Sequence, residues 1–205
     1  MRYKTYWFAG INTSNIELIA LLKSWAAISL AFSIALAGLK FSLGFIVIFL
    51  MAAITVGLGF LLHELAHKVV AQKYKCAAEF RSDDKMLILA IVLAFTGFIF
   101  AAPGAVLIHG HINKKQNGII SAAGPIANLI LTLIFIALFF LVSIPFLKIA
   151  FVYGATINTW LALFNMIPFG MFDGKKILRW NKIVYGVMIA IGALLLFFTQ
   201  SAMTY

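Results

Sequence analysis

Long apolar runs without charge are the feature that most constrains what this chain can fold into. Residues 41–62 form 22 consecutive positions that carry no ionisable side chain. A helix needs about 20 mostly apolar residues to cross a bilayer, so this segment is long enough to do so. Further apolar runs occupy residues 24–39, 119–144, 149–169 and 182–199. The sequence therefore predicts a membrane all-α fold, a polytopic helical bundle with about five spans.

Composition leaves little room for anything else. Of 205 residues, 64% are hydrophobic and only 11% are charged. A soluble domain is nearer to half apolar and a quarter charged, so no sizeable soluble domain is expected beside the spans. The chain has a single cysteine, Cys76, which excludes an internal disulfide and a cysteine-rich metal cluster.

The charge is strongly basic, with 16 Lys and Arg against six Asp and Glu and a net charge of +10. The basic residues lie between apolar runs, so the expected partner is the lipid bilayer with its anionic headgroups. We do not expect the protein to bind nucleic acid. Two basic clusters, at 68–85 and 175–182, belong on the cytoplasmic side by the positive-inside tendency. We therefore expect a multi-pass protein of the cell membrane whose N-terminus and basic loops are cytoplasmic.

The first apolar run is short unless its helix begins near Ser14-Asn15, where a capping residue precedes Glu17. A cleaved leader is the alternative, because Ala35-Leu36-Ala37 is a possible cleavage site. The leader would be unusually long, which favours a membrane span over residues 15–39.

Residues 86–106 are apolar but contain Gly97, Pro103 and Gly104. If the segment dips into the membrane and returns near Thr96-Gly97, five crossings remain. Then 14 of the 16 basic residues are cytoplasmic, and only Lys40 and Lys148 are outside. We therefore predict a re-entrant segment, formed by a β-hairpin or by a short broken helix. Irregular backbone at that depth is tolerated only inside the protein or beside a water-filled cavity.

The pentapeptide His63-Glu64-Leu65-Ala66-His67 ends the second span and carries the clearest chemistry. On a helix, positions i and i+4 share one face, so both imidazoles can reach the same cation. Zinc suits two imidazoles and a carboxylate with a fourth position open to water, and Glu64 is placed to take a proton from that water. In a soluble helix this pattern occurs by chance, but in an apolar helix three such side chains are costly unless they are paired or bind a metal.

A third ligand is then required, and Asp173 is the best candidate. It follows an apolar span, and Pro168 and Gly170 break the helix before it, so its carboxylate is expected at an irregular or restarted helix end. A surface aspartate before a lysine-rich loop is the other reading. His109 and His111 could assist in metal binding, but they lie in a polar loop, where histidines are more often simply solvated.

Three motifs in this order resemble the site-2 protease family of intramembrane zinc metalloproteases. They are His63-Glu64-x-x-His67, then Gly124-Pro125-Ile126-Ala127-Asn128, and finally Asn165-x-x-Pro168 followed by Asp173-Gly174. The resemblance covers residues 41–180. It implies one zinc per chain held by His63, His67 and Asp173, with Glu64 as the catalytic base.

The resemblance also implies that Asn165 lies near the active site, where it positions substrate or stabilises the developing oxyanion. Gly124 and Pro125 allow close helix packing, and Asn128 is left without a definite role. The implied substrates are single-span membrane proteins cut within their transmembrane segments. Many relatives carry a peptide-binding PDZ domain, and no connection in this chain is long enough to hold one.

The organisation that follows has three parts: residues 1–40 with the first span, a metalloprotease core at 41–180, and a C-terminal span at 181–205. A strand edge within the re-entrant segment 86–106 would hold an unwound substrate by backbone pairing. Two other functions remain open: a small transporter or metal-ion carrier that uses the same His and Asp residues, and a catalytically inactive scaffold. Transporters of this kind often show inverted repeats, and none is evident here.

Overall fold

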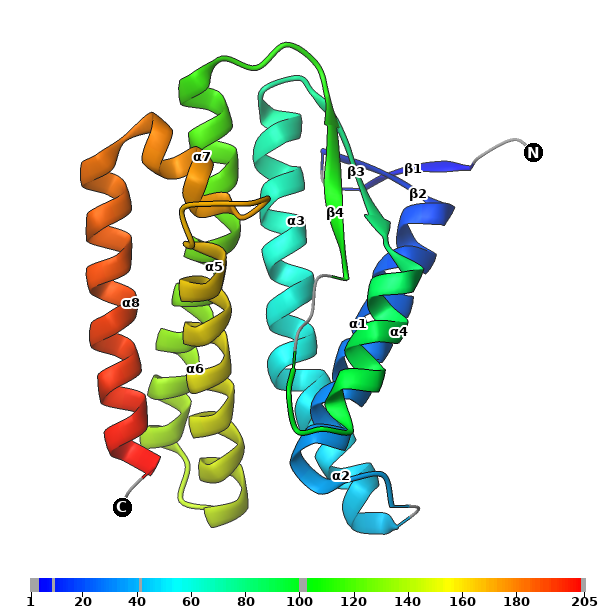
Figure 1. Ribbon diagram of the computed structural model, residues 1–205, viewed down its shortest axis with the longest axis vertical. Coiled ribbons are helices and arrows are strands. Elements are labelled where there is room, and N and C mark those ends of the chain that lie inside the picture. Colours follow the sequence, from blue (N-terminus) through cyan, green and yellow to red (C-terminus); the bar gives the residue numbers. More distant parts are fainter. Residues whose placement is uncertain (1–3, 9, 41, 100–102, 204–205) are drawn as a thin grey trace.

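The computed structural model describes residues 4–8, 10–40, 42–99 and 103–203. Within these ranges, five helices are long and apolar enough to span a membrane, as predicted. They run roughly along the long axis of the molecule in Figure 1. They are α1 (Asn15–Ala37), the continuous helix formed by α2 (Leu43–Ala52), the π-helical turn η1 (Ala53–Gly57) and α3 (Leu58–Lys73), then α5 (Lys114–Leu141), α6 (Pro145–Asn165) and α8 (Lys182–Met203). A short helix, α7 (Asp173–Trp180), precedes α8.

Polar residues set where the long helices begin. The Ser14 hydroxyl accepts the Glu17 N–H and caps α1, the start expected from the sequence. Asn113 and Gln116 form a reciprocal capping box at the start of α5, and Pro145 occupies the first turn of α6. Many large apolar side chains lie exposed on the outer faces of these helices, including Leu43 and Leu141, each 78% exposed. Such a surface suits contact with lipid rather than with water.

The re-entrant segment is present, and its two halves have different structures. Residues 84–94 form helix α4 (Asp84–Ala94), the chain turns at Gly97 with φ +77°, and it returns as strand β4 (Gly104–His109). The Asp83 N–H donates to the Pro103 carbonyl at 2.9 Å, so the outgoing and returning arms meet. The first half is helical because Asp83 caps it, accepting the N–H groups of Lys85 and Met86, and its apolar run has no break.

Strand β4 pairs antiparallel with β3 (Ala77–Ser82), which lies in the charged connection after α3. The predicted hairpin within 86–106 is therefore replaced by a sheet whose second strand comes from outside that range. Figure 1 shows this sheet beside α3, with β4 standing between β3 and the α3 helix in the view. Phe80 of β3 is buried and packs edge-to-face on Phe60 of α3 at 5.6 Å, which ties the sheet to that helix.

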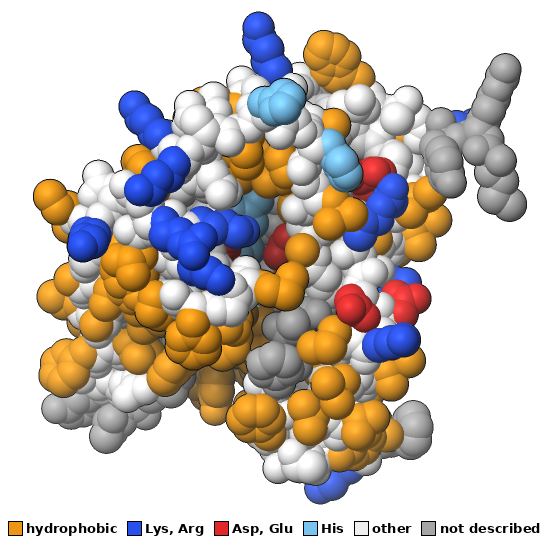
Figure 2. Space-filling model, turned by 45° about the horizontal axis from the view of Figure 1, so that its top comes forward, with side chains coloured by type: hydrophobic (Ala, Val, Ile, Leu, Met, Phe, Trp, Pro, Cys, Tyr) orange, Lys and Arg blue, Asp and Glu red, His pale blue; other side chains and the backbone are white. Residues whose placement is uncertain are grey.

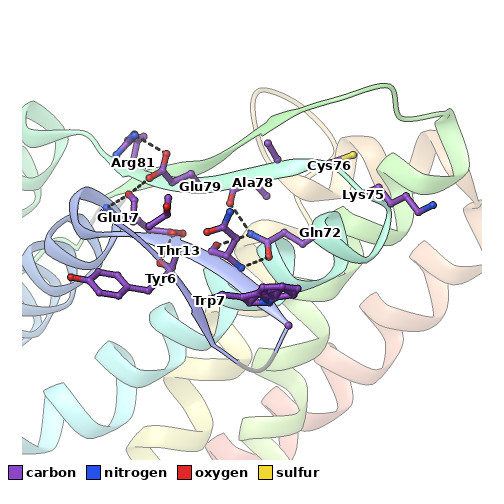
Figure 3. A pocket seen from close by; sticks show the side chains of 15 residues that line it. Tyr6, Trp7, Thr13, Glu17, Gln72, Lys75, Cys76, Ala78, Glu79 and Arg81 are labelled. Atoms are coloured by element: carbon purple, nitrogen blue, oxygen red, sulfur yellow. Dashed lines mark hydrogen bonds and ion pairs between the residues drawn. The ribbon is translucent and has the colours of Figure 1, made fainter. Parts of the chain in front are cut away.

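A second small sheet, absent from the sequence-based expectations, joins β1 (Thr5–Phe8) and β2 (Ile11–Ser14) into an N-terminal hairpin. Side chains hold this hairpin beside β3. The Gln72 amide accepts the Asn12 N–H and donates to the carbonyls of Asn12 and Ala78. A pocket of about 690 Å³ opens between the hairpin and β3 (Figure 3). None of the predicted metal ligands lines this pocket.

Candidate metal centre

Two histidines on one face of α3 and one aspartate at the start of α7 converge inside the helical bundle. His63 and His67 are one helical turn apart, and both are buried. Their Nε2 atoms are 3.0 Å apart. The Asp173 Oδ2 atom lies 3.4 Å from His63 Nε2 and 3.0 Å from His67 Nε2. The three residues predicted from the sequence as ligands are thus brought together by the fold.

These separations match what a zinc ion requires. Zinc lies about 2.0–2.2 Å from imidazole nitrogen and carboxylate oxygen in a tetrahedral site, which places neighbouring ligand atoms about 3.3 Å apart. The three ligand atoms here are 3.0–3.4 Å from one another. Two histidines and one carboxylate also leave the fourth position of such a site to water.

The outer nitrogen of each imidazole has a partner that leaves the lone pair of the inner nitrogen free to bind a metal. His67 Nδ1 lies 2.7 Å from the Ile120 carbonyl, which can only accept a hydrogen bond. His63 Nδ1 lies 2.6 Å from Asn128 Oδ1. Both Nδ1 atoms therefore carry the proton, and both Nε2 atoms present a lone pair to the same point. Two lone pairs and a carboxylate facing one another inside a protein repel unless a cation lies between them, which supports the fit of a metal ion.

Asn128 on α5 is held in the orientation that this arrangement needs. Its Nδ2 atom donates to the Gly59 carbonyl at 3.1 Å and to Asn158 Oδ1 at 3.0 Å, so its oxygen faces His63. Asn158 in turn donates to the Gly154 carbonyl and, at 3.4 Å, to the Thr55 carbonyl in the π-helical turn. Both asparagines are completely buried. This chain of amides fixes the ring of His63, a role typical of the hydrogen-bond partners behind metal ligands.

Gly124 on α5 leaves the space in which the histidines lie. A Cβ atom at this position would come within 2.4 Å of His67 Nε2 and 2.6 Å of His63 Nε2. Any side chain here would therefore displace the inner nitrogens of both rings. Glycine is needed at this position because α5 approaches the centre closely, and the following Pro125 lies inside the same helix.

The charge of Asp173 also suits a metal. Burial alone would raise the pKa of its carboxyl group, but the neighbouring imidazoles of His67 and His63 outweigh burial and hold that pKa below its usual value. Positive charge at this point therefore favours the ionised carboxylate, which is the form that binds a metal.

A comparison with curated proteins decides the family. A protein of Methanocaldococcus jannaschii named "Putative zinc metalloprotease" is 38% identical over 178 residues, which cover 85% of this chain and 90% of the relative. The chain belongs to the family of this zinc metalloprotease. The match confirms the relationship to zinc metalloproteases that the three motifs indicated. No protein-family model matches the chain, and no solved structure does either.

The other residues singled out in the sequence have different surroundings. Glu64 is half-buried on α3 and lies near enough to His63, Asp173 and Lys176 to interact with them electrostatically. Asn165 is the last residue of α6, and its Nδ2 atom donates to the Leu161 carbonyl at 2.9 Å. Its proposed role toward substrate stays a prediction. His109 and His111 are exposed and do not belong to the ligand cluster.

The sequence analysis did not predict the roles of Asn128 and Asn158 in this site. Asn128 was singled out as part of a motif, but its bond to His63 depends on how α3 and α5 pack. Asn158 was not singled out at all. An uncharged amide in an apolar run is a signal that could have found it, since a buried amide needs partners for both its oxygen and its nitrogen.

Proposed function

We propose that the protein is an intramembrane zinc endopeptidase of the site-2 type, which hydrolyses peptide bonds within transmembrane segments of other membrane proteins. The observation that carries this proposal is the position of the metal centre. Its two histidines lie on a 31-residue helix, Leu43–Lys73, with a mean hydropathy of 2.8. A hydrolytic centre attached to such a helix acts at membrane depth, where its substrates are also membrane-embedded.

His63, His67 and Asp173 would hold one zinc ion. When bound, zinc supplies a Lewis acid that activates water and polarises the carbonyl of the scissile peptide bond. Glu64 would take the proton of the attacking water and deliver it to the leaving amide nitrogen. No hydrogen bond to the Glu64 carboxylate is present among the described residues, so the group is available for this transfer. Asn165 would position the substrate or stabilise the oxyanion.

The free edge of β4 would hold the unwound substrate. Phe80 donates its N–H to Glu17, and the Ala78 carbonyl accepts from Gln72, so both groups point away from β4. Residues 77, 79 and 81 of β3 therefore face β4, and their partners on β4 are residues 109, 107 and 105.

The backbone groups of Gly104, Val106 and Ile108 must then point away from β3, toward an edge with no further strand in the described sheet. An extended peptide could add to this edge by backbone hydrogen bonds. Side chains cover the opposite edge of the sheet, on β3 (Figure 3), which leaves the β4 edge as the available one.

We place the protein in the cell membrane with its N-terminus and metal-centre side toward the cytoplasm. The basic residues at 68–85 and 175–182 lie at the ends of helices on this side, as the positive-inside tendency requires. Single-span membrane proteins are the proposed substrates.

The test is metal content and cleavage measured together on detergent-purified wild type, Glu64→Gln and the control Asp84→Asn. Asp84 is exposed and pairs with Lys23, away from the centre. We expect about one zinc per chain in all three proteins, and cleavage of a single-span test substrate by wild type and Asp84→Asn only. Zinc without cleavage in wild type would contradict the protease proposal. Absence of zinc from wild type would contradict the metal centre and favour the carrier reading.

A further inference from the structure

Positive charge collects beside the metal centre, and the acidic residues outside the centre do not balance it. The chain has only six acidic residues, and the structure shows where each one lies. Glu17 pairs with Lys68, Glu79 with Arg81, and Asp84 with Lys23. Asp83 caps α4, Asp173 belongs to the ligand cluster, and Glu64 lies near enough to Asp173 to interact with it electrostatically.

The cations beside the centre lie at the ends of α5, α7 and α8, and we call them the basic rim. Its members are Lys114, Lys115, Lys175, Lys176, Arg179 and Lys182. Five of the six are exposed, and Lys175 is half-buried. Close packing brings α5 and α7 together, since a Cβ atom on Gly118 would come within 2.3 Å of the Trp180 side chain. The cations therefore share one end of the molecule.

The basic rim begins at the metal centre itself. Lys176 Nζ lies 3.8 Å from Asp173 Oδ1, and Lys175 Nζ donates to the Gly170 carbonyl in the loop that leads to Asp173. Figure 2 shows basic side chains grouped beside a hollow in which histidine and acidic side chains are visible. A polypeptide that approaches the centre from this end comes close to these cations.

We propose that the basic rim selects substrates by the charge of the residues that flank their scissile segment on the metal-centre side. An acidic flank is attracted, and a basic flank is repelled. Because most transmembrane segments carry basic residues on the cytoplasmic side, the rim discourages the majority of membrane proteins and favours a minority with an acidic flank. This inference rests on the proposed proteolytic function and adds a substrate class to it.

Anionic lipid headgroups are the alternative ligand of the basic rim. The contact of Lys176 with a predicted metal ligand favours the peptide, because a headgroup bound there would lie in the path of the substrate. Lys175 and Arg179 lie on the same short helix, α7, so a flank that leaves the centre along this helix meets them next.

The experiment uses three single-span test substrates with one common scissile segment and four flanking residues that are all Glu, all Ser or all Lys. Cleavage is measured in nanodiscs of phosphatidylcholine alone and of phosphatidylcholine with phosphatidylglycerol. The enzymes are wild type, the rim variant Lys175→Gln/Arg179→Gln, and the control Lys40→Gln/Lys148→Gln. The control removes the same charge from residues that lie outside the rim.

Wild type should cleave the Glu-flanked substrate about tenfold faster than the Ser-flanked one, and the Lys-flanked one most slowly. High salt should bring these rates together, because exposed charges are screened within about 3 Å at 1 M ionic strength. The rim variant should also bring them together, and the control should keep the wild-type order.

Equal rates for all three flanks in wild type would overturn the inference, as would an order that persists in the rim variant. A cleavage rate that depends on the phosphatidylglycerol content and not on the flank would show that the basic rim binds lipid, and it would also overturn the inference. Failure of wild type to cleave even the Ser-flanked substrate, with the same result for Glu64→Gln, would instead refute the proposed function.

Discussion

A buried ion pair next to the metal centre offers the sharpest test of how this fold is stabilised. Lys68 follows the predicted ligand His67 on α3, and its Nζ donates to Glu17 on α1. The two residues are 1% and 0% exposed. The same carboxylate accepts the Phe80 N–H of β3 at 2.9 Å and the Thr13 hydroxyl at 2.7 Å. One buried acidic group thus joins the metal-binding helix to α1 and to both small sheets.

Replacing Lys68 by Met leaves the Glu17 charge buried without its cation. Removing one partner of a buried pair costs about 3–5 kcal/mol. The two remaining hydrogen bonds to Glu17 still stabilise its carboxylate, so we expect the lower end of that range, about 3 kcal/mol. For a chain of this size that loss corresponds to a fall of roughly 6–12 °C in the midpoint of thermal unfolding.

The double variant Lys68→Met/Glu17→Gln should recover most of this loss. Glutamine keeps an oxygen that accepts the Phe80 N–H, and it removes the unpaired charge. The assay is thermal unfolding of detergent-purified protein, with Lys23→Met as control. Lys23 forms an exposed pair with Asp84, so the control should leave the midpoint unchanged. A double variant that is less stable than Lys68→Met would refute the reasoning, because it would show that the uncompensated charge is not the source of the loss.

Three further predictions concern the centre and the substrate edge. Asn128→Ala removes the acceptor that orients His63 and should weaken zinc binding by about 10–100-fold, measured by competition with a chelator; unchanged affinity would contradict the orienting role. Gly124→Ala places a methyl group against both imidazoles and should lower the zinc content of a chain that still folds; full zinc content would show that α5 can move away. Ile108→Pro removes an N–H at the outer edge of β4 and should raise the KM for a single-span substrate while the fold stays intact. Its control is Leu107→Pro, which removes an N–H that faces β3 and should destabilise the sheet. An unchanged KM for Ile108→Pro would argue against strand addition.

The sequence by itself determined the membrane spans, because a charge-free run of 22 residues has few stable environments other than a bilayer. It determined the start of α1 at Ser14, since capping depends on neighbours in the chain. It also located two of the three metal ligands relative to each other, because the spacing of His63 and His67 on a helix places them on one face. Asp173 could be selected as the third because so few carboxylates were available.

Only the tertiary structure decided which distant groups meet. Strand β3 is a short segment that pairs with β4 more than 20 residues later in the chain. No local sequence pattern predicts such a strand, because its stability depends on this distant partner. The choice of Asn128 as the partner of His63 depended on the approach of α5 to α3, which Gly124 permits. In the sequence, Lys68 is one of several basic residues near the end of a helix. Its burial against Glu17 depends on the packing of α1 beside α3. Local chemistry fixes helix limits and motif geometry, whereas the partner of a buried polar group depends on the whole arrangement of the chain.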